Sequence, residues 1–417
     1  MRTAIIGAGI VGVTTAYELA ASGHEVTVFE RRGSVASETS FANAGVVAPG
    51  YVTPWAAPGM PWKVLQHLLS AHAPVRLQGL GAWAQLPWIW RWWRACRPAV
   101  YAANRAAMQR LARFSQDRLV ALSNTLQLDY EQHAGYMVLL RGERELAMAR
   151  GGLKLLAELG VAFELIDAAH ARAIEPGLNP ETALRAAIHL PHDGVGNCRQ
   201  FAHLLKAQAQ GLGARFVFDD AVQRVGAGTR PSVMSQAGEQ HFDAVVLCSG
   251  VESNLLLRPL GLALPLLPVY GYSVTAPLRH HDGHPDPGPR SALMDEKYKV
   301  AVSRLGRRVR VAGSAEIGGT PNTFNEAALR TLYRVLDDWF PGAAVMAKAQ
   351  RWKGARPMLP DGPPVLGASG APGIWLNLGH GSSGWALACG CARVLAEQIG
   401  GRAAPVDVDG LGIERLK

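Results

Sequence analysis

Residues 3–13 read Thr-Ala-Ile-Ile-Gly-Ala-Gly-Ile-Val-Gly-Val, an apolar run that leads directly into three closely spaced glycines. This pattern predicts a buried parallel strand over residues 2–6 and a helix over residues 11–22. Gly7 allows the tight turn, Gly9 lets the backbone approach a pyrophosphate, and Gly12 lets the helix pack closely on the strand. The first amides of the helix face the phosphate. The stretch therefore predicts a dinucleotide-binding fold.

A second apolar run, residues 25–30, predicts the next strand and ends in Glu30, 23 positions after Gly7. A carboxylate at this distance accepts hydrogen bonds from the hydroxyls of an adenosine ribose, and its charge disfavours a 2′-phosphate. An accidental glycine-rich turn is the alternative, but strand, glycines, helix, strand and acid in register argue against it. These residues alone leave NAD and FAD both open.

Further motifs lie along the chain in the stretches 30–31, 37–45, 49–59, 190–194, 243–250, 271–275, 295–299, 354–362 and 378–385. In these motifs the chain resembles, essentially from end to end, the bacterial FAD-dependent D-amino acid dehydrogenases of the D-amino acid oxidase and glycine oxidase superfamily. The resemblance selects FAD. No cysteine or histidine lies in a recognised flavin-linking context, so we expect FAD to be held non-covalently.

The length of 417 residues corresponds to two or three domains at about 150 residues each. We expect an α/β chain with a Rossmann-like, discontinuous FAD-binding domain and an α+β substrate-binding domain built on an antiparallel sheet. The expected FAD-binding segments are 1–50, 190–264 and 351–417, and the expected substrate-binding segments are 51–189 and 265–350. Further elements expected in the FAD-binding domain are helices over 199–211 and 385–399 and strands over 214–218, 242–250 and 374–378. Both substrate-binding segments are expected to be rich in strands.

The resemblance implies a set of cofactor-binding residues. They are Gly7, Gly9, Gly12, Glu30, Arg31, Ser37, Ser40, Ala44, Gly45, Val222, Gly250, Gly379, Gly381, Ser382 and Gly384. Within this set the residues of 37–45 line the pyrophosphate and the flavin edge, the Val222 backbone pairs with adenine, and the turn 379–384 faces the pyrimidine end of the flavin. For the serines of 37–45, N-capping of a short helix is the alternative role.

Four residues are expected to carry the chemistry: Arg356, Tyr272, Tyr298 and His380. A planar guanidinium fits a substrate carboxylate best, and Arg356 matches the carboxylate-binding arginine of the resembling enzymes. An ion pair with Asp361 is its structural alternative. The two tyrosines are expected to offer a hydroxyl to the carboxylate and an aromatic lid, unless they are ordinary core residues.

His380 lies between two glycines beside a helix N-terminus, whose dipole lowers the pKa of a histidine. We therefore expect a neutral hydrogen-bonding partner of flavin or substrate rather than a base. Glycine oxidases carry a second arginine in this motif, whereas this chain has Ser382 and Ser383. The difference weakens a glycine oxidase assignment and leaves room for a substrate side chain.

The expected activity is FAD-dependent oxidative deamination of D-amino acids to 2-oxo acids and ammonia, with electrons passed to a quinone-type acceptor. One alternative is oxidation of a cyclic or N-substituted amine such as D-proline or hydroxyproline. The other is a non-catalytic FAD-bearing subunit of a membrane complex. The presence of Arg356 and both tyrosines argues against the last.

The net charge of +9 suggests an anionic partner. Between residues 72 and 118 lie eight arginines (76, 91, 94, 97, 105, 110, 113 and 118) and five tryptophans (83, 88, 90, 92 and 93). Tryptophan beside arginine is typical of an element in the headgroup zone of a membrane, and a buried helix pair is the alternative. Since the resembling dehydrogenases are peripheral membrane enzymes, we expect residues 83–97 to bring the protein to the inner face of the cytoplasmic membrane.

Other classes of partner are not expected. The five scattered cysteines lack metal-binding spacing and indicate reduced thiols in the cytoplasm. No signal peptide, membrane span or nucleic-acid partner is expected. The histidine-rich loop 280–289 is interpreted as a solvated loop, because its prolines do not supply a fixed ligand geometry, so no metal is expected.

Overall fold

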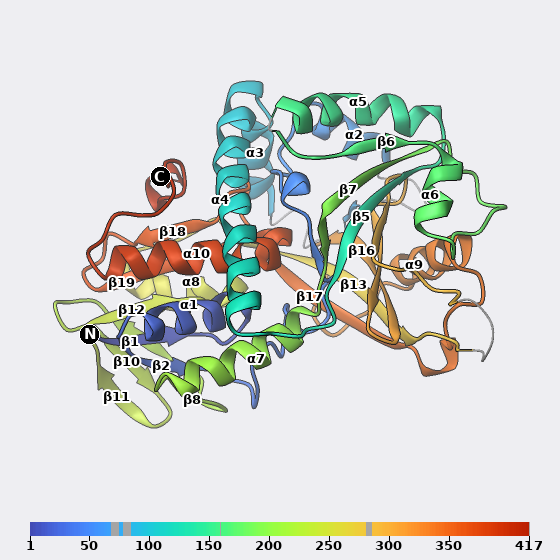
Figure 1. Ribbon diagram of the computed structural model, residues 1–417. Helices are drawn as coiled ribbons and strands as arrows, with labels where there is room; N and C mark the ends of the chain where they lie inside the picture. The colour runs from blue at the N-terminus through green and yellow to red at the C-terminus, as the bar shows by residue number, and fades with distance from the viewer. Residues whose placement is uncertain (68–74, 78–84, 159, 281–285, 417) are drawn as a thin grey trace.

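The computed structural model describes residues 1–67, 75–77, 85–158, 160–280 and 286–416. Its described strands form sheets of six, three and ten strands. Figure 1 shows the six-stranded and the ten-stranded sheet on opposite sides of the molecule, with the long helix α4 (Pro98–Thr125) between them. This arrangement matches the expected pairing of a nucleotide-binding fold with a second sheet.

The six-stranded sheet carries the glycine-rich turn. Its order is β18 (Val365–Ala368), β19 (Ile374–Leu378), β12 (Ala244–Leu247), β1 (Arg2–Ile6), β2 (Glu25–Phe29) and β8 (Arg215–Val217). All neighbours are parallel except β18 and β19. The predicted strands 2–6 and 374–378 coincide with β1 and β19, and the strand predicted over 242–250 is shorter. Because the strands are apolar on both faces, each face needs a covering layer.

Helices cover one face of this sheet and a small sheet covers the other. The first layer consists of α1 (Ile10–Ala21), α7 (Cys198–Gly211), α10 (Gly384–Ile399) and α4, which share one apolar cluster. On the other face lie α8 (Ser253–Leu257) and the three strands β9 (Arg224–Gly226), β10 (Ser232–Ser235) and β11 (Gly238–His241). The predicted helices 11–22, 199–211 and 385–399 are therefore present within one residue at each end.

The ten-stranded sheet forms the second body. Along its main path lie β17 (Gln350–Met358), β13 (Leu267–Pro277), β16 (Arg308–Ile317), β15 (Val300–Leu305), β14 (Ala292–Asp295), β5 (His133–Leu140), β7 (Ala186–Val195) and β3 (Val46–Val47). Strand β4 (Val75–Leu77) pairs with β16, and β6 (Glu164–Ile166) pairs with β7. The pairs β5–β14 and β4–β16 are parallel and the others are antiparallel, so the sheet is mixed at two places.

Sheet membership differs from the expected domain limits at three strands. Strands β3 and β17 join the ten-stranded sheet, although residues 46–47 and 351–358 were assigned to the FAD-binding segments. The limit between 189 and 190 falls inside β7. The second sheet therefore contains the strand that follows the first part of the cofactor-binding fold (β3) and the strands that precede its later parts (β7 and β17).

Much of segment 51–189 is helical, so the expectation of a strand-rich segment is wrong there. Its helices are α2 (Met60–His67), α3 (Leu86–Ala95), α4, α5 (Glu143–Glu158) and α6 (Ala168–Ile174). Helix α4 buries Leu111 and Ala112 completely against α1 and α10. The remaining long helix, α9 (Glu326–Trp339), covers one face of the ten-stranded sheet.

Candidate cofactor and substrate site

The first glycine turn leaves no room for side chains at two of its three positions. Gly7 has a φ of +102°, and a Cβ built there would lie 2.8 Å from the Cys248 carbonyl oxygen. A Cβ at Gly12 would lie 1.9 Å from the carbonyl oxygen of Gly7. Gly9 precedes α1 and provides no side-chain cap, so the first amides of the helix stay open toward a ligand. Among the described residues, a side chain engages only the Ile10 amide, which donates to Ser40 Oγ at 3.0 Å.

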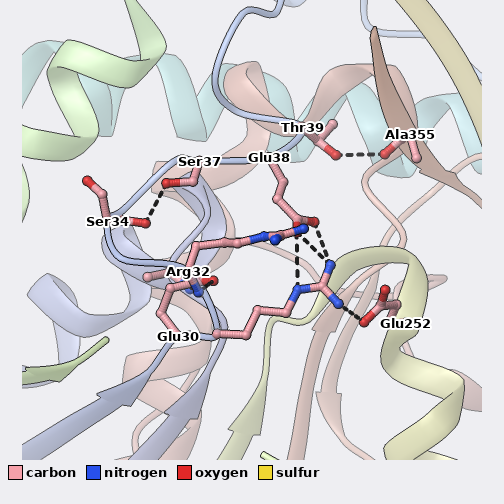
Figure 2. A network of polar contacts seen from close by, with 10 residues as sticks. Glu30, Arg32, Ser34, Ser37, Glu38, Thr39, Glu252 and Ala355 are labelled. Atoms are coloured by element: carbon pink, nitrogen blue, oxygen red, sulfur yellow. Dashed lines mark hydrogen bonds and ion pairs between the residues drawn. The ribbon is translucent and has the colours of Figure 1, made fainter. Parts of the chain in front are cut away.

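Glu30 faces this turn from the end of β2. Its Oε2 accepts a hydrogen bond from the Ala8 amide at 2.7 Å, and its Oε1 accepts one from the Arg32 amide at 2.9 Å. These bonds fix the carboxylate at the place where the sequence predicts ribose binding. Figure 2 shows Glu30 beside a network that joins residues 30–39 to Glu252.

The guanidinium of Arg31 bridges two carboxylates in that network. It pairs with Glu38 at 2.6 Å and with Glu252 of the 3₁₀ turn Gly250–Glu252. Arg32 also pairs with Glu38, at 2.9 Å. Arg31, predicted as a cofactor ligand, therefore ties the loop after β2 to the turn that begins at Gly250.

Four further residues predicted to bind the cofactor make different contacts in the structure. Ser37 Oγ donates to the Ser34 carbonyl at 2.8 Å within its own turn, and Ser40 binds the start of α1 rather than a short local helix. Gly45 has a φ of +76° and lies beside Gly196 and Trp385. Val222 lies just before β9, half-buried against the cluster under the six-stranded sheet.

A second glycine turn joins β19 to α10. Gly379 and Gly381 have φ values of +77° and +55°, and Cβ atoms built there would lie 2.3 Å from Leu359 and 2.6 Å from Met358. Helix α10 begins at Gly384 without a side-chain cap, next to the predicted Ser382. The fold therefore presents two uncapped helix N-termini that suit an anionic, hydrogen-bonding group.

His380 lies in this turn and is 4% exposed. A β-bridge between His380 and Met358 connects the turn to the end of β17. Burial lowers the pKa of His380 to about 4, so the imidazole is neutral at neutral pH. Its Nε2 atom is buried and has no hydrogen-bonding partner within the described residues. A buried polar atom without a partner is rare in proteins and indicates a place for a ligand or a water.

Arg356 lies two residues before Met358 on the same strand. Its guanidinium lies against Gly271, where a Cβ would approach within 2.4 Å, and its Nη1 donates to the Ser314 carbonyl at 2.9 Å. Burial lowers the pKa of Arg356 to about 10, which still leaves the guanidinium charged at neutral pH. No carboxylate in the described part of the chain pairs with it, and the alternative partner Asp361 binds Arg415 at 2.8 Å. The proposed Arg356–Asp361 ion pair is therefore excluded, and the cation can accept an anionic ligand.

Sequence reasoning missed Ser314, which presents its carbonyl to Arg356. Ser314 has a φ of +63°, in a region that non-glycine residues rarely adopt, at the point where the pairing of β13 with β16 shifts register. Nothing in the sequence marks Ser314. Gly271, by contrast, stands in a motif that the sequence singled out.

The two predicted tyrosines lie apart from Arg356. Alternation along paired strands β13 and β17 places Gly271 and Arg356 on one face and Tyr272 and Lys353 on the other. Tyr272 is 1% exposed in the cluster beneath α9, and its hydroxyl donates to Glu316. Tyr298 lies in the same cluster, with the Arg141 guanidinium 5.1 Å from its ring centre. The structure thus brings together Arg356, His380 and the glycine turn, and it places both tyrosines in a core.

Two further features concern metals and thiols. All five cysteines are buried and unpaired. The described residues contain no group of three or more histidine, cysteine or acidic side chains arranged to hold a metal ion, and residues 281–285 of the histidine-rich loop lie outside them. The candidate site consists of the two glycine turns, the helix N-termini that follow them, Glu30, His380 and Arg356.

Comparisons with known proteins agree on one family. The family described as FAD dependent oxidoreductase matches residues 2–398. A D-amino acid dehydrogenase of Cereibacter sphaeroides is 43% identical over all of this chain and 95% of its own length. One from Rhizorhabdus wittichii is 42% identical over the whole of both chains.

Solved structures share the fold at low sequence identity. Glycine oxidase from Geobacillus kaustophilus is 19% identical, with a TM-score of 0.77 over 99% of this chain and 98% of its own. L-proline dehydrogenase from P. horikoshii is 19% identical, with a TM-score of 0.76 over the same shares of the two chains. These likenesses confirm the mixed α/β fold class predicted from the sequence.

Proposed function

Because this chain belongs to the family of FAD-dependent oxidoreductases, we propose that it oxidises D-amino acids to 2-oxo acids and ammonia. The relatives at 42–43% identity are named D-amino acid dehydrogenases. The single observation that carries the proposal is Arg356, a partly buried cation without a carboxylate partner among the described residues. It lies two residues before Met358, which bridges to His380 in the second glycine turn.

The residues present fit non-covalent FAD. The open amides at the starts of α1 and α10 suit the pyrophosphate and the polar edge of the flavin, and Glu30 suits the ribose. The unpartnered Nε2 atom of His380 supplies a further polar contact. When bound, FAD supplies a ring that accepts a hydride.

Arg356 and His380 have distinct proposed roles toward the substrate. The Arg356 fork binds the carboxylate in a bidentate manner and so orients Cα. The substrate loses a hydride from Cα and a proton from its neutral amine, the nitrogen lone pair forms a C=N bond, and water then releases ammonia and the 2-oxo acid. Because burial keeps His380 uncharged at neutral pH, we assign it the role of a neutral hydrogen-bonding partner of flavin or substrate.

Anaerobic flavin reduction tests this proposal. Purified protein that carries FAD is mixed without oxygen with D-alanine, D-proline and their L-enantiomers, and loss of the oxidised flavin band is recorded. We expect bleaching by D-alanine and none by L-alanine. Bleaching by D-proline alone would favour oxidation of cyclic amines, and no bleaching by any amine would favour a non-catalytic FAD-bearing subunit.

We propose a quinone-type acceptor for the reduced flavin, in line with the name dehydrogenase carried by the relatives. After anaerobic reduction by D-alanine, the flavin is reoxidised either with oxygen or with a water-soluble quinone. Faster reoxidation by the quinone at equal concentration is expected. Equal or faster reoxidation by oxygen would make the protein an oxidase.

Contact with a membrane surface through residues 83–97 is the last part of the proposal. Among the described residues, no helix is both long and apolar enough to cross a membrane. On α3, Trp90 and Trp93 are 57% and 52% exposed and stack on each other beside the exposed Arg91 and Arg94. Trp88 is buried, so only part of the tryptophan set faces outward, and Trp83 lies outside the described residues. Exposed tryptophan and arginine on one helix suit an anionic lipid surface.

Co-sedimentation with anionic vesicles tests the contact. The double substitution Trp90→Ser, Trp93→Ser should reduce the fraction that pellets at low salt, and high salt should reduce it in the wild type. The control Met148→Ser, Leu165→Ser removes two exposed apolar side chains elsewhere and should leave pelleting unchanged. Pelleting that is absent in the wild type would refute the contact.

A further inference from the structure

Three consecutive carbonyl groups of the loop before β3 are bound by side chains of the ten-stranded sheet. Ser273 Oγ donates to the Ala42 carbonyl at 2.8 Å, and Arg310 Nη1 donates to the Asn43 carbonyl at 2.9 Å. Ser303 Oγ donates to the Ala44 carbonyl at 2.7 Å. We call Ser273, Arg310 and Ser303 the carbonyl clamp.

The clamp comes from three adjacent strands, β13, β16 and β15. Arg310 is paired in register with Thr275 on one side and with Ser303 on the other. Its Nε donates to Thr275 Oγ1 at 2.9 Å, which fixes the plane of the guanidinium. Ser273 pairs with Ala312, two residues along β16 from Arg310, so the three donors lie on a diagonal across adjacent strands.

The members of the clamp are deeply buried. Ser273 and Ser303 have no exposed surface, and Arg310 is 6% exposed. Burial lowers the pKa of Arg310 to about 10, and no carboxylate in the described residues pairs with this cation, since Glu131 pairs with Arg308 instead. Burying a cation without an anion is costly, so the clamp is a poor device for stability alone. This cost suggests that holding the loop serves function.

Peptide geometry fixes what the clamp does to the loop. In a planar trans peptide, the N–H of one residue points opposite to the C=O of the residue before it. With the carbonyls of Ala42 and Asn43 directed into the sheet, the N–H groups of Asn43 and Ala44 are directed away from it. Neither N–H has an acceptor among the described residues. The next carbonyl, that of Gly45, accepts hydrogen bonds from the Gly196 amide at 2.9 Å and from Trp385 Nε1 at 3.2 Å.

We propose that the carbonyl clamp positions the loop so that the N–H groups of Asn43 and Ala44 donate to bound FAD. Ser273, Arg310 and Ser303 are positioning residues, because they act through the loop and do not themselves touch the cofactor. The inference rests on the proposed place of residues 44–45 at the flavin edge. It makes the substrate-binding sheet a determinant of FAD affinity.

FAD titration of the apoprotein tests the clamp. Ser273→Ala and Ser303→Ala each remove one neutral hydrogen bond and should raise the Kd for FAD by about threefold to tenfold. Arg310→Met removes a charge-assisted bond and should raise the Kd by about tenfold or more. The midpoint potential of the bound flavin should also fall, since donors that stabilise its reduced form are displaced.

Ser291→Ala is the matched control. Ser291 is 6% exposed, and its Oγ donates to the Gly135 carbonyl beside the same sheet but away from the loop. Ser291→Ala should lower the thermal stability of the apoprotein as much as the clamp variants do. Its Kd for FAD and its flavin midpoint potential should stay at the wild-type values. If Arg310→Met does not fold, the two serine variants carry the test.

Wild-type Kd and potential in both serine variants would overturn the inference. The outcome differs from failure of the proposed function, in which the wild-type protein itself would not bind FAD or would not be reduced by D-alanine.

Discussion

Two buried polar clusters lie on opposite faces of strand β17, three residues apart along the chain, and they differ in how completely they are paired. Lys353 donates to Glu316 at 3.1 Å and to the Thr323 carbonyl at 2.7 Å, and Tyr272 donates to the same carboxylate. On the other face, Arg356 has one carbonyl partner. The Nε2 atom of His380 has no partner among the described residues.

We interpret the fully paired cluster as structural, and we propose that the incompletely paired cluster is a binding site. In the Lys353 cluster the charges compensate each other, so removing one member leaves its partner buried and unpaired. In the Arg356 cluster no carboxylate of the described residues compensates the charge, so we expect its removal to lower function more than stability. Substitutions in the two clusters should therefore affect different quantities.

The largest effect is expected for Lys353→Met, which leaves Glu316 as an unpaired buried carboxylate. The free energy of unfolding should fall by about 3–5 kcal/mol, as measured by urea denaturation, while the KM for D-alanine stays within about twofold of the wild type. The double variant Lys353→Met, Glu316→Leu should recover most of the loss. A large rise in KM without loss of stability would place Lys353 in the substrate site.

Arg356→Lys should raise the KM for D-alanine and leave stability nearly unchanged, the opposite of Lys353→Met. An ammonium group cannot reproduce the bidentate fork, so substrate binding should weaken by about 2–5 kcal/mol, measured as a rise in KM. Thermal stability should stay near that of the wild type. Arg415→Lys, at an arginine paired with Asp361, is the control and should lower stability without changing KM. Near wild-type KM in Arg356→Lys would assign Arg356 a structural role.

The lowered pKa of His380 makes the free energy of unfolding depend on pH. Its pKa is lowered from 6.5 to about 4, so between these values the unfolded chain binds a proton that the folded chain does not. The free energy of unfolding therefore falls as pH falls through this window, by about 3 kcal/mol from this residue. The effect is measured as the difference between wild type and His380→Asn from pH 7 to about pH 4. If the free energy of unfolding varied with pH in the same way in both proteins, the lowered pKa of His380 would be contradicted.

The smallest effect is expected for Tyr272→Phe. The substitution removes one hydrogen bond to Glu316, which Lys353 still compensates, so stability should fall by about 1–2 kcal/mol and KM should not change. A tenfold rise in KM at unchanged stability would instead support the role predicted for Tyr272 from the sequence, a hydroxyl that binds the substrate carboxylate.

The sequence could predict the parts of the molecule that local pattern determines. Strands β1 and β19 and helices α1, α7 and α10 follow from apolar runs bounded by glycines, and both glycine turns need glycine for steric reasons. The role predicted for Arg356 rests on the resemblance of residues 354–362 to a known family, and it stays a prediction. Helices α3 and α4 are anticipated only by the alternative of a buried helix pair, because the tryptophans and arginines of this stretch were interpreted by composition and not by their helical period.

The faces of the second sheet could not be predicted. Tyr272 follows Gly271 directly, and strand alternation puts the two on opposite faces, but which face α9 covers depends on packing between distant segments. The register shift at Ser314, which aims a carbonyl at Arg356, also has no local signal. Packing of α9 on the sheet, and not the local sequence, therefore decides whether Tyr272 lies in the core or on a ligand-binding face.

Binding of an unreactive carboxylate tests the central claim most directly. Propionate has the carboxylate and carbon chain of D-alanine but no amine, so its binding to the oxidised FAD-loaded enzyme can be followed through the flavin spectrum without turnover. We expect equal affinity in the wild type and Tyr272→Phe, and loss of binding in Arg356→Lys. Undiminished binding in Arg356→Lys together with weakened binding in Tyr272→Phe would contradict the account.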